Sequence, residues 1–344
     1  MEWLYVVGGR QRPEAAGLEE WHRFEAAVIA CVHPESGEVR IVEEYVSPPE
    51  ACPDEQPSFV FKAGHLEGTR LFVSTQTEVL VYELPSMQRV GYVSLPCFND
   101  VHHARPLANG NIAVVSTGLD AVFEVTPRGR VVREWGAMGA DPFDRFSRDV
   151  DYRKVSTTKP HASHPNFVFE LEGEPWVTRF EQRDAIRLDC ATDRMAIDVE
   201  RPHDGVVCED EVVFTTVDGH VVRFDARSRA RTACHDLNAI GPGDKLLGWC
   251  RSVAPIGPDR FAVGFTRIRR TRFRENLGWA RRRLGQLVRG ESGGASSSGP
   301  SRVAAYDFGG PGELLWECCV EDAGMNVIFS IHPVDAMRVA ARRS

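Results

Sequence analysis

The sequence has no long apolar run and no excess of positive charge. None of its hydrophobic stretches is long enough for a helix that crosses a bilayer, so we expect no transmembrane segment. The formal net charge is -8, with 41 Lys and Arg against 49 Asp and Glu, which argues against a general nucleic-acid-binding protein. The first residues, MEWLYVVGGRQRPE, lack a basic region followed by an apolar one and therefore predict no signal peptide.

The sequence also lacks the cysteine spacing of a metal-binding or redox motif. Its 9 cysteines form no CxxC pair, and their number is odd. Cys31, Cys97, Cys190, Cys208 and Cys250 fall in strand-like runs, where cysteine behaves as a small buried hydrophobe. Without evidence of a disulfide framework, we expect a reducing compartment and predict a cytoplasmic protein.

A repeat of about 40 residues is the main pattern that the sequence contains. In its clearest copy, Phe98 to Trp135, four short apolar runs are separated by turn residues. One of these turns holds Asn109-Gly110, the strongest short signal for a β-hairpin. The run LFVST at Leu71 to Thr75 aligns without a gap with AVVST inside this copy. Four antiparallel strands per repeat predict the blades of a β-propeller.

The ends of the chain predict how the ring closes. The N-terminal copy has only three strand-like runs, and the chain ends its pattern on a lone strand at 325–333. Placing this strand in the N-terminal blade removes two exposed sheet edges. The prediction is an all-β chain, with one β-propeller domain of six blades over 1–344. Five or seven blades are the alternative counts.

Two insertions interrupt the repeat, at 136–160 and 267–299. The second combines a basic helix with a Gly/Ser linker, because Leu277, Leu284 and Leu287 recur at helical spacing before a Gly/Ser-rich stretch. We expect this helix to lie over one rim of the propeller. A lid over the axial opening and peripheral membrane contact through 267–289 are the alternatives.

Histidines recur at the start of the strand that should line the central channel in each blade. His102 and His103, His161 and His164, then His203 and His332 occupy these places in successive copies. Neutral imidazole is a common ligand for transition metals, and side chains from several blades converge on the propeller axis. We therefore predict one divalent metal ion on the axis, iron first, with manganese, copper or zinc as alternatives. The predicted ligands are His103, His164, His203 and His332.

Two arginines fall in the same first-strand positions. Arg105 and Arg251 would suit a carboxylate, phosphate or sulfate on a small-molecule substrate. We predict His103, Arg105 and Arg251 as the catalytic residues. The simpler interpretation stays open for each of them, since a lone histidine in a strand is often packed in the core and an arginine often pairs with a neighbouring blade.

The stretch HHARPLANGNIAVVSTGLDAVFEVTPRGRVVREW resembles blades of arylsulfotransferase-like and NHL-type propellers. The shared features are the histidines of the first strand, the turn Leu107 to Asn111 and the tail Glu124 to Trp135. In the sulfotransferases a channel histidine becomes sulfated, while other histidines and an arginine bind the sulfuryl group. The resemblance gives such roles to His103, His203, His332 and Arg251.

A second resemblance concerns architecture alone. Carotenoid-cleaving oxygenases hold iron with four axial histidines, and metal-dependent propeller lyases use a similar set. The leading hypothesis is therefore a metal-dependent enzyme of oxygenase or lyase type that acts on a small, anionic organic molecule at the axis. The alternatives are a metal-free group transfer through a channel histidine, and a non-catalytic propeller that binds a ligand on one face.

Overall fold

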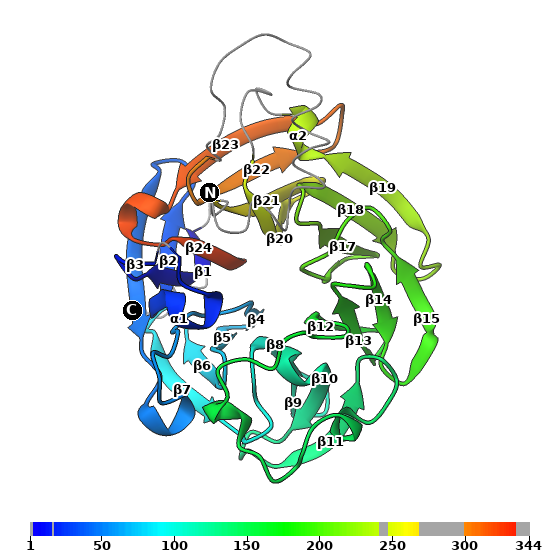
Figure 1. Cartoon of the computed structure of the whole chain (residues 1–344). Coiled ribbons are helices and arrows are strands. Elements are labelled where there is room, and N and C mark those ends of the chain that lie inside the picture. Colours follow the sequence, from blue (N-terminus) through cyan, green and yellow to red (C-terminus); the bar gives the residue numbers. More distant parts are fainter. Residues whose placement is uncertain (1–2, 16, 241–246, 268–298, 335–344) are drawn as a thin grey trace.

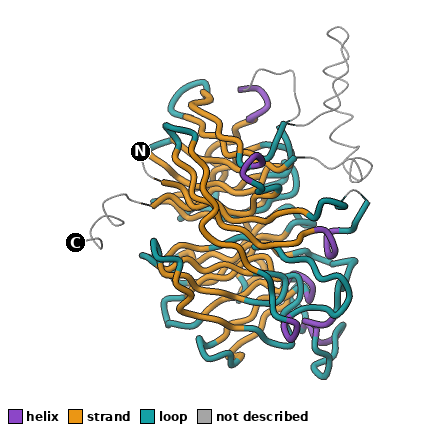
Figure 2. The backbone as a smooth tube through the Cα atoms, turned by 90° about the vertical axis from the view of Figure 1, so that its left-hand side faces the viewer, coloured by secondary structure: helices purple, strands orange, loops and turns teal. Residues whose placement is uncertain are grey.

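The computed structural model describes residues 3–15, 17–240, 247–267 and 299–334. These residues form six four-stranded antiparallel sheets that stand around a common axis (Figure 1). The side view in Figure 2 shows that the strands are joined by loops at both faces of the ring. The predicted all-β propeller with six blades is confirmed.

The strands follow one order in every blade, from the axis to the rim. Blades 1 to 3 consist of β24 (Val327–Val334), β1 (Trp3–Gln11), β2 (Phe24–His33) and β3 (Glu38–Tyr45); β4 (His65–Glu67), β5 (Arg70–Ser74), β6 (Val79–Glu83) and β7 (Gln88–Val93); and β8 (Val101–Pro106), β9 (Ile112–Ser116), β10 (Ala121–Val125) and β11 (Val131–Gly136). Blades 4 to 6 consist of β12 (Pro165–Leu171), β13 (Glu174–Arg179), β14 (Asp184–Arg187) and β15 (Cys190–Ala196); β16 (Val206–Cys208), β17 (Glu211–Thr215), β18 (His220–Asp225) and β19 (Arg231–Asp236); and β20 (Trp249–Gly257), β21 (Arg260–Thr266), β22 (Arg302–Asp307) and β23 (Glu313–Cys319).

Short helical turns lie between the strands. They are α1 (Glu20–Arg23), α2 (Leu237–Ile240), and the 3-10 turns η1 (Pro49–Ala51), η2 (Thr117–Leu119), η3 (Pro142–Asp144), η4 (Tyr152–Lys154) and η6 (Glu321–Ala323). Among the described residues, no helix is long and apolar enough to cross a membrane.

Burial within a blade falls from the middle strands to the rim. Every residue of β9 and β10 is buried, because neighbouring blades cover both faces of these strands. In β11, on the rim, Val131 and Val132 are exposed. The continuous apolar runs of the middle strands therefore follow from packing between blades, and these contacts hold the ring together.

The ring closes as predicted, by pairing β24 with β1. In this ladder Tyr5 lies opposite His332 and Val7 opposite Ser330. The two strands approach so closely that a Cβ on Gly8 would lie 1.8 Å from the carbonyl oxygen of Val327. Gly8 is therefore required at this position, since any side chain would push the closing strand away.

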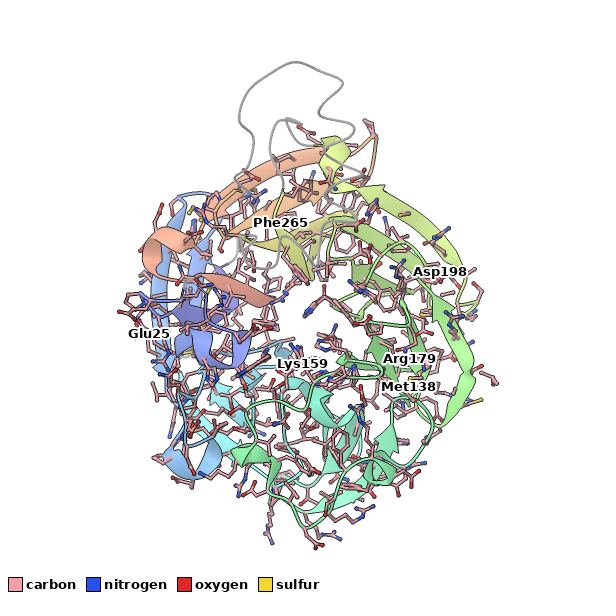
Figure 3. All side chains as sticks on the ribbon, viewed as in Figure 1. Glu25, Met138, Lys159, Arg179, Asp198 and Phe265 are labelled. Atoms are coloured by element: carbon pink, nitrogen blue, oxygen red, sulfur yellow. The ribbon has the colours of Figure 1, made fainter. Side chains whose placement is uncertain are left out.

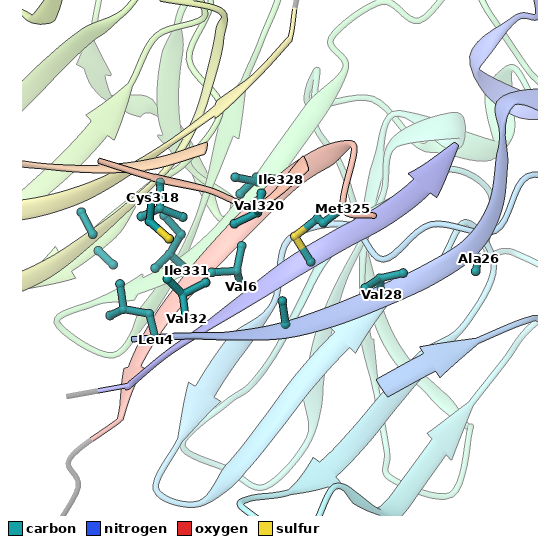
Figure 4. Packing of buried hydrophobic residues seen from close by; sticks show 14 residues of the cluster. Leu4, Val6, Ala26, Val28, Val32, Cys318, Val320, Met325, Ile328 and Ile331 are labelled. Carbon is teal, nitrogen blue, oxygen red and sulfur yellow. The ribbon is translucent and has the colours of Figure 1, made fainter. Parts of the chain in front are cut away.

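A shared hydrophobic core joins the closing blade to blade 6. Leu4 and Val6 of β1 and Ile328 of β24 belong to one buried cluster with Ala262 and Val303 (Figure 4). Full burial of a side chain of this size stabilises a fold by roughly 1.5–3 kcal/mol. The first and last strands of the propeller thus pack together against blade 6, in one hydrophobic interface.

The first insertion leads from the rim of blade 3 back to the axis. Its turn η4 is anchored by Asn99, whose side-chain nitrogen donates to the carbonyl oxygens of Tyr152 and Val155 at 2.8 and 2.7 Å. Further along, Lys159 lies near the centre of the ring (Figure 3). The predicted basic helix and linker of 267–299 lie outside the described residues, except for their two ends.

Candidate functional site

Two cavities open on the axis of the propeller. The first, of about 660 Å³, is lined by His102, His161, His164, His203 and Arg251, among others, and we call it the histidine pocket. The second, of about 440 Å³, is lined by Arg105, Glu170, His65, His332 and Phe167, among others, and we call it the Arg105 pocket.

The two pockets lie at opposite ends of the channel. Along β8, His102 lines the histidine pocket and Arg105, three residues later, lines the Arg105 pocket. Along β20, Arg251 lines the first and Val253 the second. Successive positions of the same inner strands therefore supply both ends of the axis, since a strand advances about 3.3 Å per residue.

Imidazole rings from three blades meet in the histidine pocket. The ring centroid of His102 lies 4.9 Å from that of His164 and 6.1 Å from that of His203. His161 adds a fourth ring, 5.0 Å from His164. Burial lowers the pKa of all four side chains, so they are neutral at pH 7.

His102 has a fixed tautomer. Its Nδ1 lies 2.9 Å from the carbonyl oxygen of Asp100, and a carbonyl only accepts, so Nδ1 carries the hydrogen. The lone pair is then on Nε2. Burial lowers the pKa of His102 to about 4, although the Asp100 carboxylate opposes this shift. The Nε2 atom of His102 can therefore accept a proton or a hydrogen bond.

The loop that carries His161 and His164 is held by one carboxylate. Asp120 accepts hydrogen bonds from the backbone N–H groups of Ala162, Ser163 and His164, at 2.7, 2.9 and 2.9 Å. The Nδ1 atoms of His161 and His164 are 2.8 Å apart, so one of them donates to the other. This anchoring places the loop against the channel with little freedom.

His203 has an unsatisfied nitrogen at the pocket wall. The side chain is buried, and its Nδ1 makes no hydrogen bond in the described part of the chain. An unpaired buried polar atom costs about 1–3 kcal/mol, and a ligand that pairs with it recovers this cost. Burial and the nearby Arg251 guanidinium both lower the pKa of His203.

Charged side chains of both signs surround these rings. The ammonium group of Lys62 is almost fully buried and lies 3.3 Å from Asp100 Oδ1 and 3.6 Å from Glu20 Oε1. Although burial opposes ionisation, Lys62 holds the pKa of Asp100 well below its usual range. Arg251 lies over the ring of Phe329, with its guanidinium carbon 4.5 Å from the centroid. A buried guanidinium beside neutral imidazoles favours an anionic ligand.

Two residues that line the histidine pocket have left-handed backbone conformations directly before an inner strand. Asp100 and His164 have φ of 47° and 53° without being glycine. Such conformations cost about 1–3 kcal/mol each. Ser252, inside β20, has φ of 74° and lines the Arg105 pocket.

The Arg105 pocket has different walls. Arg105 and Glu170 form an ion pair at 3.4 Å, with both side chains mostly buried. Ser330 Oγ, which accepts from Gly64 N–H at 2.9 Å, lies 2.9 Å from His332 Nε2. Burial lowers the pKa of His332 to about 3.

His103 lies between the pockets and is held by the backbone. Its Nδ1 accepts from Val168 N–H and its Nε2 lies against the carbonyl of Gly64, both at 3.2 Å. Its ring stacks on Phe167 with centroids 3.7 Å apart. Both ring nitrogens therefore have backbone partners in this arrangement, and the ligand and catalytic roles of His103 stay predictions.

The structure divides the predicted site. His164 and His203 line the histidine pocket, His332 lines the Arg105 pocket, and His103 separates the two. Among the described residues, no group of three or more His, Cys, Asp or Glu side chains has an arrangement that could hold a metal ion. The prediction of one axial ion bound by these four histidines thus does not match the arrangement of their rings, because positions adjacent in sequence face different ends of the channel.

The predicted arginines are divided in the same way. Arg251 lines the histidine pocket, whereas Arg105 lies at the other end and pairs with Glu170. His102 and His161, which are not among the four ligands predicted from the sequence, both line the histidine pocket. The sequence interpretation missed Lys62 and Asp120, for which hydrophobic periodicity gives no signal.

Comparisons with known proteins identify the fold alone. The sequence matches no known family model, and no curated protein matches it. A crystal structure of a protein of unknown function from Bacteroides caccae is similar over 97% of this chain and 99% of that chain, with TM-score 0.58 and 14% identity. At this identity the likeness shows the shared propeller fold.

Two further likenesses are more distant. A chain of the mitotic checkpoint complex has TM-score 0.49 and 9% identity, covering 97% of this chain and 88% of that one. Virginiamycin B lyase from Staphylococcus aureus has TM-score 0.42 and 12% identity, covering 76% of this chain and 81% of that one. Neither bears on function, and the arylsulfotransferase resemblance stays a prediction from the sequence of one blade.

Proposed function

We propose that the chain is an enzyme that acts on a small, anionic organic molecule in the histidine pocket, with His102 as the proton acceptor. The observation that carries the proposal is the fixed tautomer of His102, which leaves the lone pair on Nε2 of a neutral ring. A general base must be unprotonated at working pH and held in place, and His102 meets both conditions; its pKa of about 4 restricts it to acidic substrate protons.

The surrounding residues support the choice of substrate. The Arg251 guanidinium would bind a carboxylate, phosphate or sulfate group. The Asp100 carboxylate, 3.7 Å from His102 Nδ1, would stabilise the imidazolium that forms when Nε2 takes a proton from the substrate. The proton leaves again with the departing group or with water, so the enzyme returns to its starting state. Lyase chemistry is one of the two reaction types in the leading hypothesis from the sequence, which assigns the chemistry to a metal ion and not to a histidine base.

A direct test compares two histidine variants from opposite ends of the channel. A collection of small carboxylic acids, phosphate esters and sulfate esters is screened for turnover by the full chain. His102→Gln should lower kcat by about 100-fold or more, whereas His65→Gln in the Arg105 pocket should leave kcat unchanged. Equal rates for both variants would exclude His102 as the base.

The same Nε2 atom could act as a nucleophile instead. A sulfo- or phospho-histidine at His102, trapped by rapid quenching and found by mass spectrometry, would identify group transfer in place of proton abstraction. If no compound is turned over but anions bind, the chain is a binding propeller, and the enzyme proposal is wrong.

The predicted divalent metal remains a second hypothesis, supported by the contact between the rings of His102, His164 and His203. Binding one ion would require these rings to turn from the arrangement described above. Elemental analysis of the purified chain and of His203→Ala tests it. About one metal per chain, lost in the variant, would support a metal centre, and a metal-free protein after reconstitution with Fe, Mn, Cu and Zn would exclude it.

A further inference from the structure

The Arg105 pocket is a cavity that the proposed reaction does not use. It lies at the other end of the channel from His102 and has its own volume of about 440 Å³, which is within the range of small-molecule sites. Its lining comes from the inner strands of several blades, as does that of the histidine pocket.

Apolar side chains form most of its walls. Leu66, Phe169, Val206 and Ile331 line the cavity, together with Phe167. The ring of Phe167 is held from behind by His103, at a centroid distance of 3.7 Å. A planar apolar ring would bury its faces against these side chains. Because Phe167 is already held in place, binding would cost little side-chain conformational entropy at this position.

An ion pair is set into this wall, beside the polar side chains of His65, Asp204, Ser252, Ser330 and His332. The guanidinium of Arg105 and the carboxylate of Glu170 lie 3.4 Å apart, and their side chains are 16% and 17% exposed. Arg105 Nε also donates to the carbonyl of Pro106 at 3.2 Å. The pair therefore presents N–H donors and a carboxylate acceptor side by side at the edge of an apolar cavity.

The pair also selects the charge of a ligand. An anion that approaches Arg105 meets the Glu170 carboxylate, and a cation that approaches Glu170 meets Arg105. A carboxamide avoids both repulsions, because its carbonyl oxygen accepts from Arg105 while its N–H group donates to Glu170.

We propose that the Arg105 pocket binds an uncharged planar molecule that carries an amide, either a carboxamide on an aromatic ring or a cyclic amide. The amide spans Arg105 and Glu170, and the ring lies against Phe167, Phe169 and Val206. This site is separate from the histidine pocket and does not depend on the reaction proposed there.

Three probes of the same shape test the charge selection on the full chain. Benzamide, benzoate and benzamidine differ mainly in charge, at 0, −1 and +1 near pH 7. Binding is followed by NMR through the methyl groups of Leu66, Val206 and Ile331, with the exposed Val131 and Val132 on the rim as controls. Benzamide should bind at least fivefold more tightly than either charged probe and should shift only the pocket methyls. Equal affinities, or no shift of these methyls at millimolar probe, would overturn the proposal.

Single-charge variants then invert the preference. Glu170→Gln leaves Arg105 as the only charge of the pair and should make benzoate the best probe, by fivefold or more over benzamide. Arg105→Met leaves Glu170 and should favour benzamidine to the same extent. The double variant Arg105→Met/Glu170→Met should show neither inversion, because the remaining carboxyl of the lining, Asp204, is common to all the variants. An unchanged probe order in both single variants, with thermal unfolding showing that they are folded, would contradict the role of the pair.

Discussion

The two ends of the channel share the inner strands β8 and β20 but differ in chemistry. At one end, neutral imidazoles lie beside an arginine and a buried lysine–carboxylate cluster. At the other, apolar side chains lie beside the Arg105–Glu170 ion pair, with Asp204 and His332 also in the lining. The difference arises because successive positions of one strand face different ends and surroundings, as His102 and His103 do on β8. Function can therefore change at one end while the strand that carries it keeps its packing.

Lowering the pH to mildly acidic values should produce the largest change in the free energy of unfolding. The change should arise from histidines at both ends of the channel. Burial lowers the pKa of His102 to about 4 and the pKa of His65 and His332 to about 3. In the unfolded chain these side chains bind protons near pH 6.5, so stability is complete above that pH and falls below it. The decrease continues until each folded pKa is reached.

The expected loss between pH 7 and 5 is on the order of 4 kcal/mol for the three side chains together. Urea unfolding at the two pH values measures it. His332→Gln should reduce the pH dependence by less than a third, because burial also lowers the pKa of His161, His164 and His203. A free energy of unfolding that is equal at pH 7 and 5 would show that these histidines are not kept neutral by the fold.

The second largest loss of stability should come from a change at His103, the neighbour of His102. Replacing His103 with alanine removes partners from Val168 N–H and the Gly64 carbonyl and leaves a cavity beside Phe167. We expect this change to lower the free energy of unfolding by about 3 kcal/mol. Chemical denaturation measures the loss, and His103→Gln is a milder companion variant.

Anion binding by His103→Gln should equal that of the wild type at a temperature where both are folded. A variant that keeps full stability but no longer binds anions would show instead that His103 is a site residue.

A smaller effect separates the two arginines. Arg251→Met should weaken binding of inorganic phosphate or oxalate about tenfold, because it removes a charge-assisted hydrogen bond of about 1.5–3 kcal/mol from the histidine pocket. Arg105→Met should leave this affinity unchanged, because Arg105 pairs with Glu170 at the far end. Isothermal titration calorimetry on the two variants gives the comparison, and an equal loss in both would contradict the separation of the pockets.

Much of the fold could be predicted from the sequence. Period-two runs and the turn at Asn109-Gly110 predict local hairpins, and the missing N-terminal strand predicts closure by β24. The hairpins depend on local backbone preferences and on pairing between near neighbours, whereas closure follows from the need to pair two exposed sheet edges. The first strand of each blade was therefore placed on the axis correctly.

The site was harder to predict, because it depends on which way each side chain points. A shift of one residue on a strand moves a histidine from one face to the other, and β8 has an irregular register between Val101 and His103. The contacts of Lys62 with Asp100 and of Asp120 with the loop before β12 join neighbouring blades. Periodicity within one blade carries no information about them.

The central claim is that His102, and not His103, is available to a ligand. A long-range 1H–15N NMR spectrum of the histidine rings at pH 7 tests it, with phosphate as the added anion. We predict that both rings are neutral, with hydrogen on Nδ1 of His102 and on Nε2 of His103, and that only the His102 signals move when phosphate is added. A positively charged His102, or a shift of the His103 signals while those of His102 stay fixed, would contradict the account.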